Sequence, residues 1–112
     1  MGETELSERA VRLKIYLGES DRFGGKPAYQ AVVELMRKRG LWGATVTRGV
    51  YGYGKRSLLH SASVLRLSED LPLIIEVVEA EEKVSALVPE LSTMVRGGLI
   101  TVEDVRVLRH LG

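Results

Sequence analysis

The sequence predicts an α+β fold in which an antiparallel sheet carries two helices on one face. Stretches in which every second residue is apolar indicate strands, and two stretches with apolar residues at helical spacing indicate helices. These elements follow one another in the order strand, helix, strand, strand, helix, strand. The chain has 112 residues, enough for one hydrophobic core and too few for two, so residues 1–112 are expected to form a single domain.

The first strand and the first helix are expected within residues 11–40. From residue 11 to residue 17 aliphatic residues alternate with polar or aromatic ones, as in a half-buried strand. The polar residues 1–9 before it are expected to be flexible. A charged loop with glycines follows over residues 18–25, and Pro27 suits the first turn of a helix. Apolar residues at helical spacing over residues 28–39 predict that helix, with Gly40 as its C-terminal cap.

The middle of the chain predicts strands on either side of a loop. Residues 41–51 contain β-branched residues and indicate a strand, whereas residues 62–67 fit either a further strand or the returning limb of the loop. The most apolar run of the chain, L-I-I-E-V-V at residues 73–78, comes directly after Leu71-Pro72. A run this apolar suits a central strand that is covered on both faces.

The last third of the chain predicts one helix and one strand. Carboxylates within residues 79–82 favour a helix start, and apolar residues over 84–94 continue that helix. Pro89 lies inside it and is expected to kink it, because proline removes a backbone donor. Residues 99–109 predict the final strand, whose alternation slips at Glu103-Asp104 and indicates a bend or bulge there.

This order of elements predicts a ferredoxin-like βαββαβ sandwich, with both helices on one face of the sheet. The opposite face must then be polar or covered by other subunits. The residues expected on that opposite face are Tyr16, Thr45, Thr47 and Tyr51.

Composition narrows the classes of function. The net charge of +1 argues against nucleic acid as a partner, and the absence of cysteine removes disulfides, thiolate metal ligands and a cysteine nucleophile. The N-terminus lacks the apolar core of a signal peptide, and no apolar run approaches the ~20 residues that span a bilayer. We therefore expect a soluble, cytoplasmic protein without direct membrane insertion.

No motif in the sequence supports an enzyme. The chain shows neither a Ser-His-acid arrangement nor an H-E-x-x-H motif, and no carboxylate pair stands in an apolar setting. Its acidic clusters fall at the ends of the expected elements, where helix capping and solubility explain them. We expect a protein that is not an enzyme.

The segment from Val46 to Ser63, V-T-R-G-V-Y-G-Y-G-K-R-S-L-L-H-S-A-S, carries the main functional signal. Its glycines can expose backbone N–H groups beside an anion, and the cations Lys55 and Arg56 follow at once. Residues 49–55 fit G-x-x-x-x-G-K, but Arg56 stands where a nucleotide-binding P-loop needs Ser or Thr for magnesium. The P-loop interpretation therefore fails. Two uses stay open: an anion site, or a mobile arm that contacts a partner protein.

Four segments in register resemble the uncharacterised PII-like proteins of bacteria and archaea, within the PII signalling superfamily. They are K-I-Y-L-G-E (14–19), G-K-P-A-Y (25–29), A-T-V-T-R-G-V-Y-G-Y-G (44–54) and L-S-E-D-L-P-L-I-I-E-V-V (67–78). The resemblance spans nearly the whole chain and implies a ferredoxin-like protomer that forms a homotrimer. It implies that an adenine nucleotide such as ATP, ADP or AMP binds between subunits. It also implies a long loop, the T-loop, that docks on a partner such as a membrane transporter or channel.

The resemblance also implies site residues. Residues 52–63 correspond to the T-loop, and the glycine pair at its base lies near nucleotide phosphates in the superfamily, with two cations directly after it. PII proteins carry a phosphate-gripping G-D-G-K turn before the last strand, which is reduced here to R-G-G at residues 96–98. Arg106, further along the chain, matches phosphate-binding arginines of PII proteins by position alone. The ligand-binding residues implied are Gly52, Gly54, Lys55, Arg56, Arg96, Gly97, Gly98 and Arg106.

Two alternatives remain. A divalent-metal-binding trimer of the same architecture is disfavoured because the chain has two histidines and no cysteine. A purely structural trimeric adaptor would use the loop for protein contacts without any small-molecule ligand. In that case Gly52 and Gly54 only let the chain leave the strand sharply, and Lys55 and Arg56 are solvated surface charges.

Overall fold

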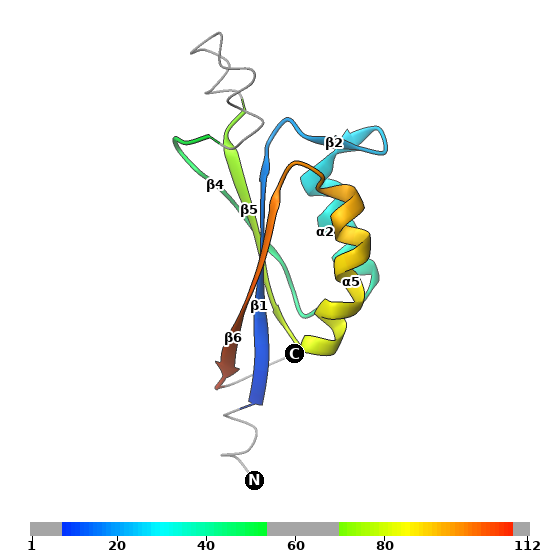
Figure 1. The fold of residues 1–112 in the computed structure, drawn as a ribbon, viewed down its shortest axis with the longest axis vertical. Helices are drawn as coiled ribbons and strands as arrows, with labels where there is room; N and C mark the ends of the chain where they lie inside the picture. The colour runs from blue at the N-terminus through cyan, green and yellow to red at the C-terminus, as the bar shows by residue number, and fades with distance from the viewer. Residues whose placement is uncertain (1–7, 54–69, 109–112) are drawn as a thin grey trace.

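The computed structural model describes residues 8–53 and 70–108, which contain eight elements in chain order (Figure 1). They are β1 (Glu8–Gly18), β2 (Arg22–Phe23), β3 (Lys26–Pro27), α2 (Ala28–Lys38), β4 (Thr45–Arg48), β5 (Pro72–Glu79), α5 (Glu81–Met94) and β6 (Leu99–Val107). The short strands β2 and β3 pair with each other in a small hairpin, which the sequence showed only as a charged loop. Residues 1–7, 54–69 and 109–112 lie outside the described part. With them lie most of the N-terminal segment expected to be flexible and residues 62–67, predicted as a further strand or the returning limb of the loop.

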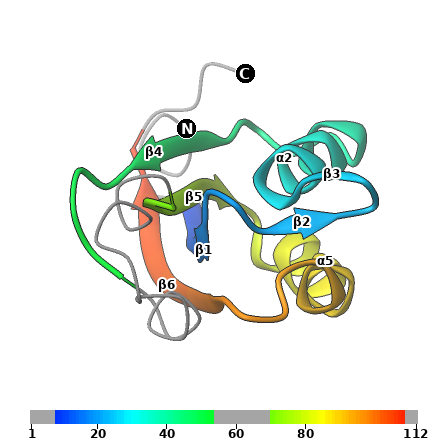
Figure 2. The same cartoon turned by 90° about the horizontal axis from the view of Figure 1, so that it is seen from above.

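The main sheet has four strands in the order β4-β5-β1-β6, and all neighbouring pairs are antiparallel. Helices α2 and α5 lie side by side on one face of this sheet (Figure 2). This arrangement confirms the predicted ferredoxin-like α+β sandwich.

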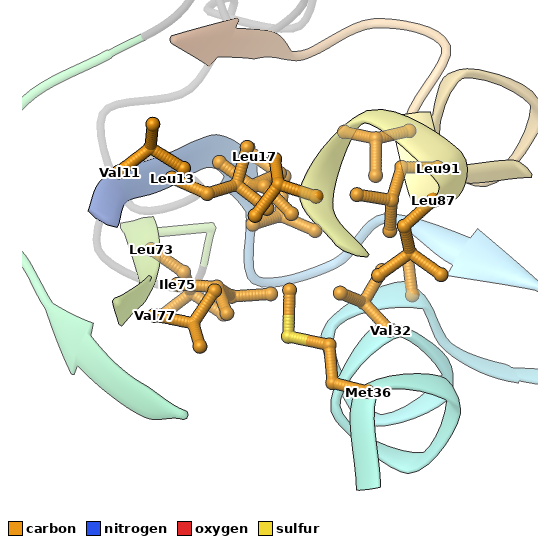
Figure 3. Packing of buried hydrophobic residues seen from close by; sticks show 14 residues of the cluster. Val11, Leu13, Leu17, Val32, Met36, Leu73, Ile75, Val77, Leu87 and Leu91 are labelled. Atoms are coloured by element: carbon orange, nitrogen blue, oxygen red, sulfur yellow. The ribbon is translucent and has the colours of Figure 1, made fainter. Parts of the chain in front are cut away.

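The core lies between the sheet and the helices (Figure 3). Every second residue of β1 from Val11 to Leu17 is buried, as the alternation predicts. The register places Leu13 opposite Val77, and the helices close the core from above with side chains such as Met36 and Leu91, each at most 1% exposed. We call this side of the sheet the helix face.

The opposite side, the open face, has no helix over it in the described part of the chain. The register places Tyr16 and Thr47 opposite Ile74 and Thr45 opposite Glu76, so strand pairing confirms three of the four predicted open-face residues. Arg12 is ion-paired there with Glu76 on β5 (Nε to Oε2, 3.2 Å) and with Glu103 on β6 (Nη1 to Oε1, 3.4 Å). The fourth predicted residue, Tyr51, follows β4 and is 86% exposed.

Of the bend or bulge predicted at Glu103-Asp104, the bulge is wrong, because β1 and β6 pair in one continuous register from Glu8–Val107 to Tyr16–Leu99. The alternation changes phase for another reason. Ile100 packs against the core, whereas Asp104 on the same face is exposed. On the helix face the apolar residues therefore give way to an exposed aspartate at Asp104, while the pairing of the strand stays unchanged.

Strand β4 is shorter than the predicted residues 41–51, because a tertiary contact diverts its beginning. Glu79, predicted to favour the helix start, instead ends β5 and is 1% exposed. Its carboxylate accepts hydrogen bonds from the backbone N–H of Trp42 at 2.9 Å and of Ala80 at 3.0 Å. These bonds hold Trp42 next to the start of α5 and away from the sheet ladder.

Candidate functional site

Four connecting segments meet at one end of the sheet, where β1 and β4 finish and β5 and β6 begin (Figure 1). We call it the loop end. It contains residues 18–21 after β1, residues 49–53 after β4, residues 70–71 before β5 and residues 95–98 before β6. The antiparallel order brings these segments to the same end, so four of the five predicted ligand-binding residues that the structure describes lie there.

The glycines before the T-loop-like segment let the chain pass close over Pro72. The N–H of Gly49 donates to the carbonyl of Pro72 at 2.8 Å, and a Cβ on Gly49 would lie 2.9 Å from the Pro72 ring. Gly52 has φ +154°, and a Cβ there would lie 3.3 Å from the same ring. Close approach to the Pro72 ring accounts for both glycines without any ligand, and at Gly52 the positive φ adds a further reason. Gly54, Lys55 and Arg56 lie outside the described residues.

Carboxylates tie the strand ends together beside these glycines. Asp21 accepts from the N–H of Gly18 at 3.0 Å, and Asp70 accepts from the N–H of Ser20 at 3.0 Å. Glu19 pairs with Arg48 at the end of β4, and its own N–H donates to the carbonyl of Leu71 at 2.9 Å. The described part of the loop end beside these glycines is thus linked by hydrogen bonds across the strand ends and rich in carboxylates. An anion there would depend on cations such as Lys55 and Arg56, which directly follow it in the sequence.

The predicted R-G-G turn lies between α5 and β6. A Cβ on Gly98 would overlap the carbonyl oxygen of Tyr16 and a methyl group of Val95, so only glycine fits this position. Arg96 is exposed at the rim of a ≈ 320 Å³ pocket beside the β2–β3 hairpin, which Arg22 also lines. Sequence reasoning missed Arg22, because nothing in a charged loop signals which of its cations will face α5.

The predicted residues that the structure describes do not form one site within a protomer. Gly52 follows β4 and Arg96 precedes β6, and these are the two outer strands of the sheet. Arg106 pairs with Arg9 seven positions along β6 from Leu99, about 23 Å away at the usual strand rise. The structure thus places Gly52 and Arg96 at the loop end on opposite edges, and Arg106 toward the other end.

The described residues contain no group of three or more His, Cys, Asp or Glu side chains that could hold a metal ion. Within this same part of the chain, no helix has the length and apolar character needed to cross a membrane.

Comparison with known proteins identifies relatives over nearly the whole chain. The model of the family DUF190, described as "Uncharacterized ACR, COG1993", matches residues 10–107. A UPF0166 protein of Aquifex aeolicus (strain VF5) is 38% identical over 96 residues, which are 86% of this chain and 90% of that protein. A UPF0166 protein of Methanocaldococcus jannaschii is 38% identical over 102 residues, covering 90% of this chain and 94% of the relative.

Among solved structures, CPII of Thiomonas intermedia K12, a nitrogen regulatory PII-like protein, has the same fold. The two chains superpose with a TM-score of 0.65 at 20% sequence identity, and the match covers 91% of each.

Proposed function

The chain belongs to the DUF190 family, and from this premise we propose that it is a PII-like regulatory protein that works as a homotrimer and senses a small anionic ligand. The proposed ligand is an adenine nucleotide, bound between neighbouring subunits. Ligand binding would change the conformation of the T-loop-like segment and so its docking on a partner, such as a membrane transporter or channel. The proposal is for a cytoplasmic binding protein, not an enzyme.

One observation carries the proposal: Gly52 and Arg96 lie at the same end of the sheet but on opposite edges. In the proposed ring of identical subunits, the β4 edge of one subunit would face the β6 edge of the next, a head-to-tail contact that closes on itself. Residues that cannot meet within a protomer then meet across each interface. The nucleotide's phosphates would contact the loop base and its cations from one subunit, and Arg96 to Gly98 from the neighbour.

Both edges carry apolar surface suited to such an interface. On the β4 side Val46 is 37% exposed, and on the β6 side Leu99 and Val102 are 57% and 50% exposed. Burying such residues against a second copy removes apolar surface from water, which favours association.

The choice of ligand is supported by the PII-like protein CPII, whose structure is described as bound to ADP, AMP and acetate. For sensing, the nucleotide must bind the two loop conformations with different affinity, since a ligand with equal affinity shifts no equilibrium. The proposed partner surface includes Val50 and Tyr51 at the start of the loop, which are 93% and 86% exposed.

Calorimetry with ATP, ADP, AMP, cyclic dinucleotides and S-adenosylmethionine tests the sensing claim. We expect saturable binding of at least one adenine nucleotide, weakened in Lys55→Ala and Arg56→Ala but not in the control Arg37→Ala on α2. Absence of saturable binding of every compound would contradict it. Light scattering tests the trimer by its mass.

A mixing experiment tests whether the site is shared. Lys55→Ala and Arg96→Ala would each abolish tight binding when present in all subunits. Refolded together, the two variants form rings in which some interfaces join an intact loop base to an intact Arg96, so a fraction of sites recovers. A site contained within one subunit predicts no recovery.

The adaptor alternative is favoured by the exposed run Val50, Tyr51 and Tyr53, which could contact a protein without any small molecule. It predicts that Lys55→Ala and Arg56→Ala weaken capture of the partner while nucleotides have no influence on that capture.

A further inference from the structure

A pocket between the β2–β3 hairpin and the end of α5 is lined by two arginines from distant parts of the chain. Arg22 lies on β2 and Arg96 lies two residues after α5, and both line the same ≈ 320 Å³ pocket with Phe23 and Thr93. We propose that this pocket binds a small, doubly charged oxyanion, a phosphate or a dicarboxylate, within a single protomer.

The backbone under both arginines is fixed. Arg22 pairs with Pro27 across the hairpin, and its Nη2 donates to the carbonyl of Gly25 at 2.9 Å. That bond uses one of the five N–H donors of the guanidinium, and the others have no acceptor among the described residues. On the other side, Gly98 packs against the Tyr16 carbonyl and so fixes the turn that carries Arg96.

The net charge around the pocket favours an anion. Arg96 forms no ion pair with any other described residue, and neither does Arg22. Two groups oppose an anion: the Asp21 carboxylate, whose Oδ2 accepts from Gly18 N–H, and the C-terminus of α5, which carries about half a negative charge. The two guanidinium charges exceed these, and their planar donor forks match the paired oxygens of a phosphate or carboxylate.

The size of the pocket sets the class of ligand. Its volume of ≈ 320 Å³ is at the lower end of the ~300–1,000 Å³ typical of small-molecule sites. A free phosphate or a short dicarboxylate fits this space better than a whole nucleotide does.

This inference shares Arg96 with the proposed nucleotide site, but it needs no second subunit, because every lining residue comes from one chain. Arg22 separates the two claims. It is not part of the proposed nucleotide site, so Arg22→Gln would weaken anion binding and leave nucleotide binding unchanged. Lys55→Ala would do the opposite.

The test is calorimetric titration of the full chain at low ionic strength with inorganic phosphate and, separately, with succinate. We expect saturable binding of at least one, and the stronger of the two identifies the source of the oxyanion. Loss of one charge-assisted contact should weaken binding about 10-fold or more in Arg22→Gln and in Arg96→Gln. Arg22→Lys keeps the charge but loses the fork, and should bind with intermediate affinity.

The matched control is Arg37→Gln, which removes the same charge from an exposed position on α2. It should bind within about twofold of the unmodified protein, because a distant surface charge is screened. Thermal unfolding shows that each variant is folded. The proposal is overturned if neither probe binds saturably, if both pocket variants bind normally, or if Arg37→Gln loses as much affinity as they do.

Discussion

The helix face and the open face of the sheet are built from the same strands and differ in what they carry. On the helix face, β1 from Val11 to Leu17 and β5 from Leu73 to Glu79 present side chains that are at most 6% exposed, and the only charge among these is the hydrogen-bonded Glu79. On the open face the same strands present Arg12, Lys14, Tyr16, Ile74 and Glu76, all partly exposed.

The difference separates two tasks. The helix face holds the protomer together, because its side chains are already removed from water by α2 and α5. The open face mixes ion pairs with apolar side chains that nothing in the described protomer covers. Such a surface contributes little to folding and is available for association.

The largest expected effect tests this division directly with two neighbouring isoleucines. Ile75, on the helix face, is 0% exposed, and Ile75→Ala should lower the free energy of unfolding by about 2–5 kcal/mol. Ile74→Ala, on the open face, is the matched control. At low protein concentration it should lose clearly less free energy of unfolding than Ile75→Ala. Urea unfolding of both variants measures the difference. Equal losses at low concentration would mean that the open face is as important to the protomer as the core.

Gly98→Ala tests the junction where the loop end meets the sheet. The added methyl group would overlap the Tyr16 carbonyl and Val95, and the backbone must shift, at a cost of about 1–3 kcal/mol. Gly43→Ala is the control, since a Cβ there has no heavy atom within 4 Å. Thermal unfolding compares the two, and a Gly98→Ala midpoint as high as that of Gly43→Ala would refute the close contact.

Glu79→Ala tests the one buried charge on the helix face. It removes the acceptor of the Trp42 and Ala80 N–H groups, and should cost about 1–2 kcal/mol because Ala80 remains accessible to water. Glu76→Ala on the open face is the control, with a side chain that is 43% exposed. Chemical unfolding of both variants should rank Glu79→Ala as the less stable protein. The reverse order would contradict a structural role for the buried carboxylate.

The smallest effect is expected for Arg12→Met, which removes the ion pairs of the open face. These pairs are partly exposed, so the protomer should lose at most about 1 kcal/mol, and less in high salt. Measuring unfolding at low and high salt checks this result. A loss much larger than that, insensitive to salt, would show that Arg12 belongs to a buried interface.

Patterns within single strands and helices predicted most of this fold. The alternation over residues 11–17 identified both faces of β1, and α2 begins at Ala28 and ends one residue before the predicted boundary. Predictions failed where contacts between residues distant in sequence determine the structure. The Trp42–Glu79 hydrogen bond shortened β4. The exposed Asp104 on the helix face, not a bulge, explains the change of pattern at Glu103-Asp104.

The candidate site was less accessible to sequence reasoning. Gly52 and Arg96 were recognised, but their positions on opposite edges follow from the strand order, which no local pattern contains. Arg22 was missed because its place in the pocket depends on the hairpin turn, where Gly24 and Gly25 have φ +60° and +80°. Arg106 matched by position along the sequence, and position alone does not bring it to the loop end.

The hydrogen bonds around Pro72 have a consequence for how such a protein can diversify. The chain entering residues 54–69 is held by the Gly49–Pro72 bond, and the chain leaving them by the bonds from Glu19 and Ser20 to Leu71 and Asp70. The scaffold therefore fixes the separation of the two ends. A flexible insert of twice the length placed between them would cost only about 0.6 kcal/mol more in closure entropy. Different sequences, and so different binding specificities, can be placed between residues 53 and 70, by evolution or by grafting, while the sheet stays the same.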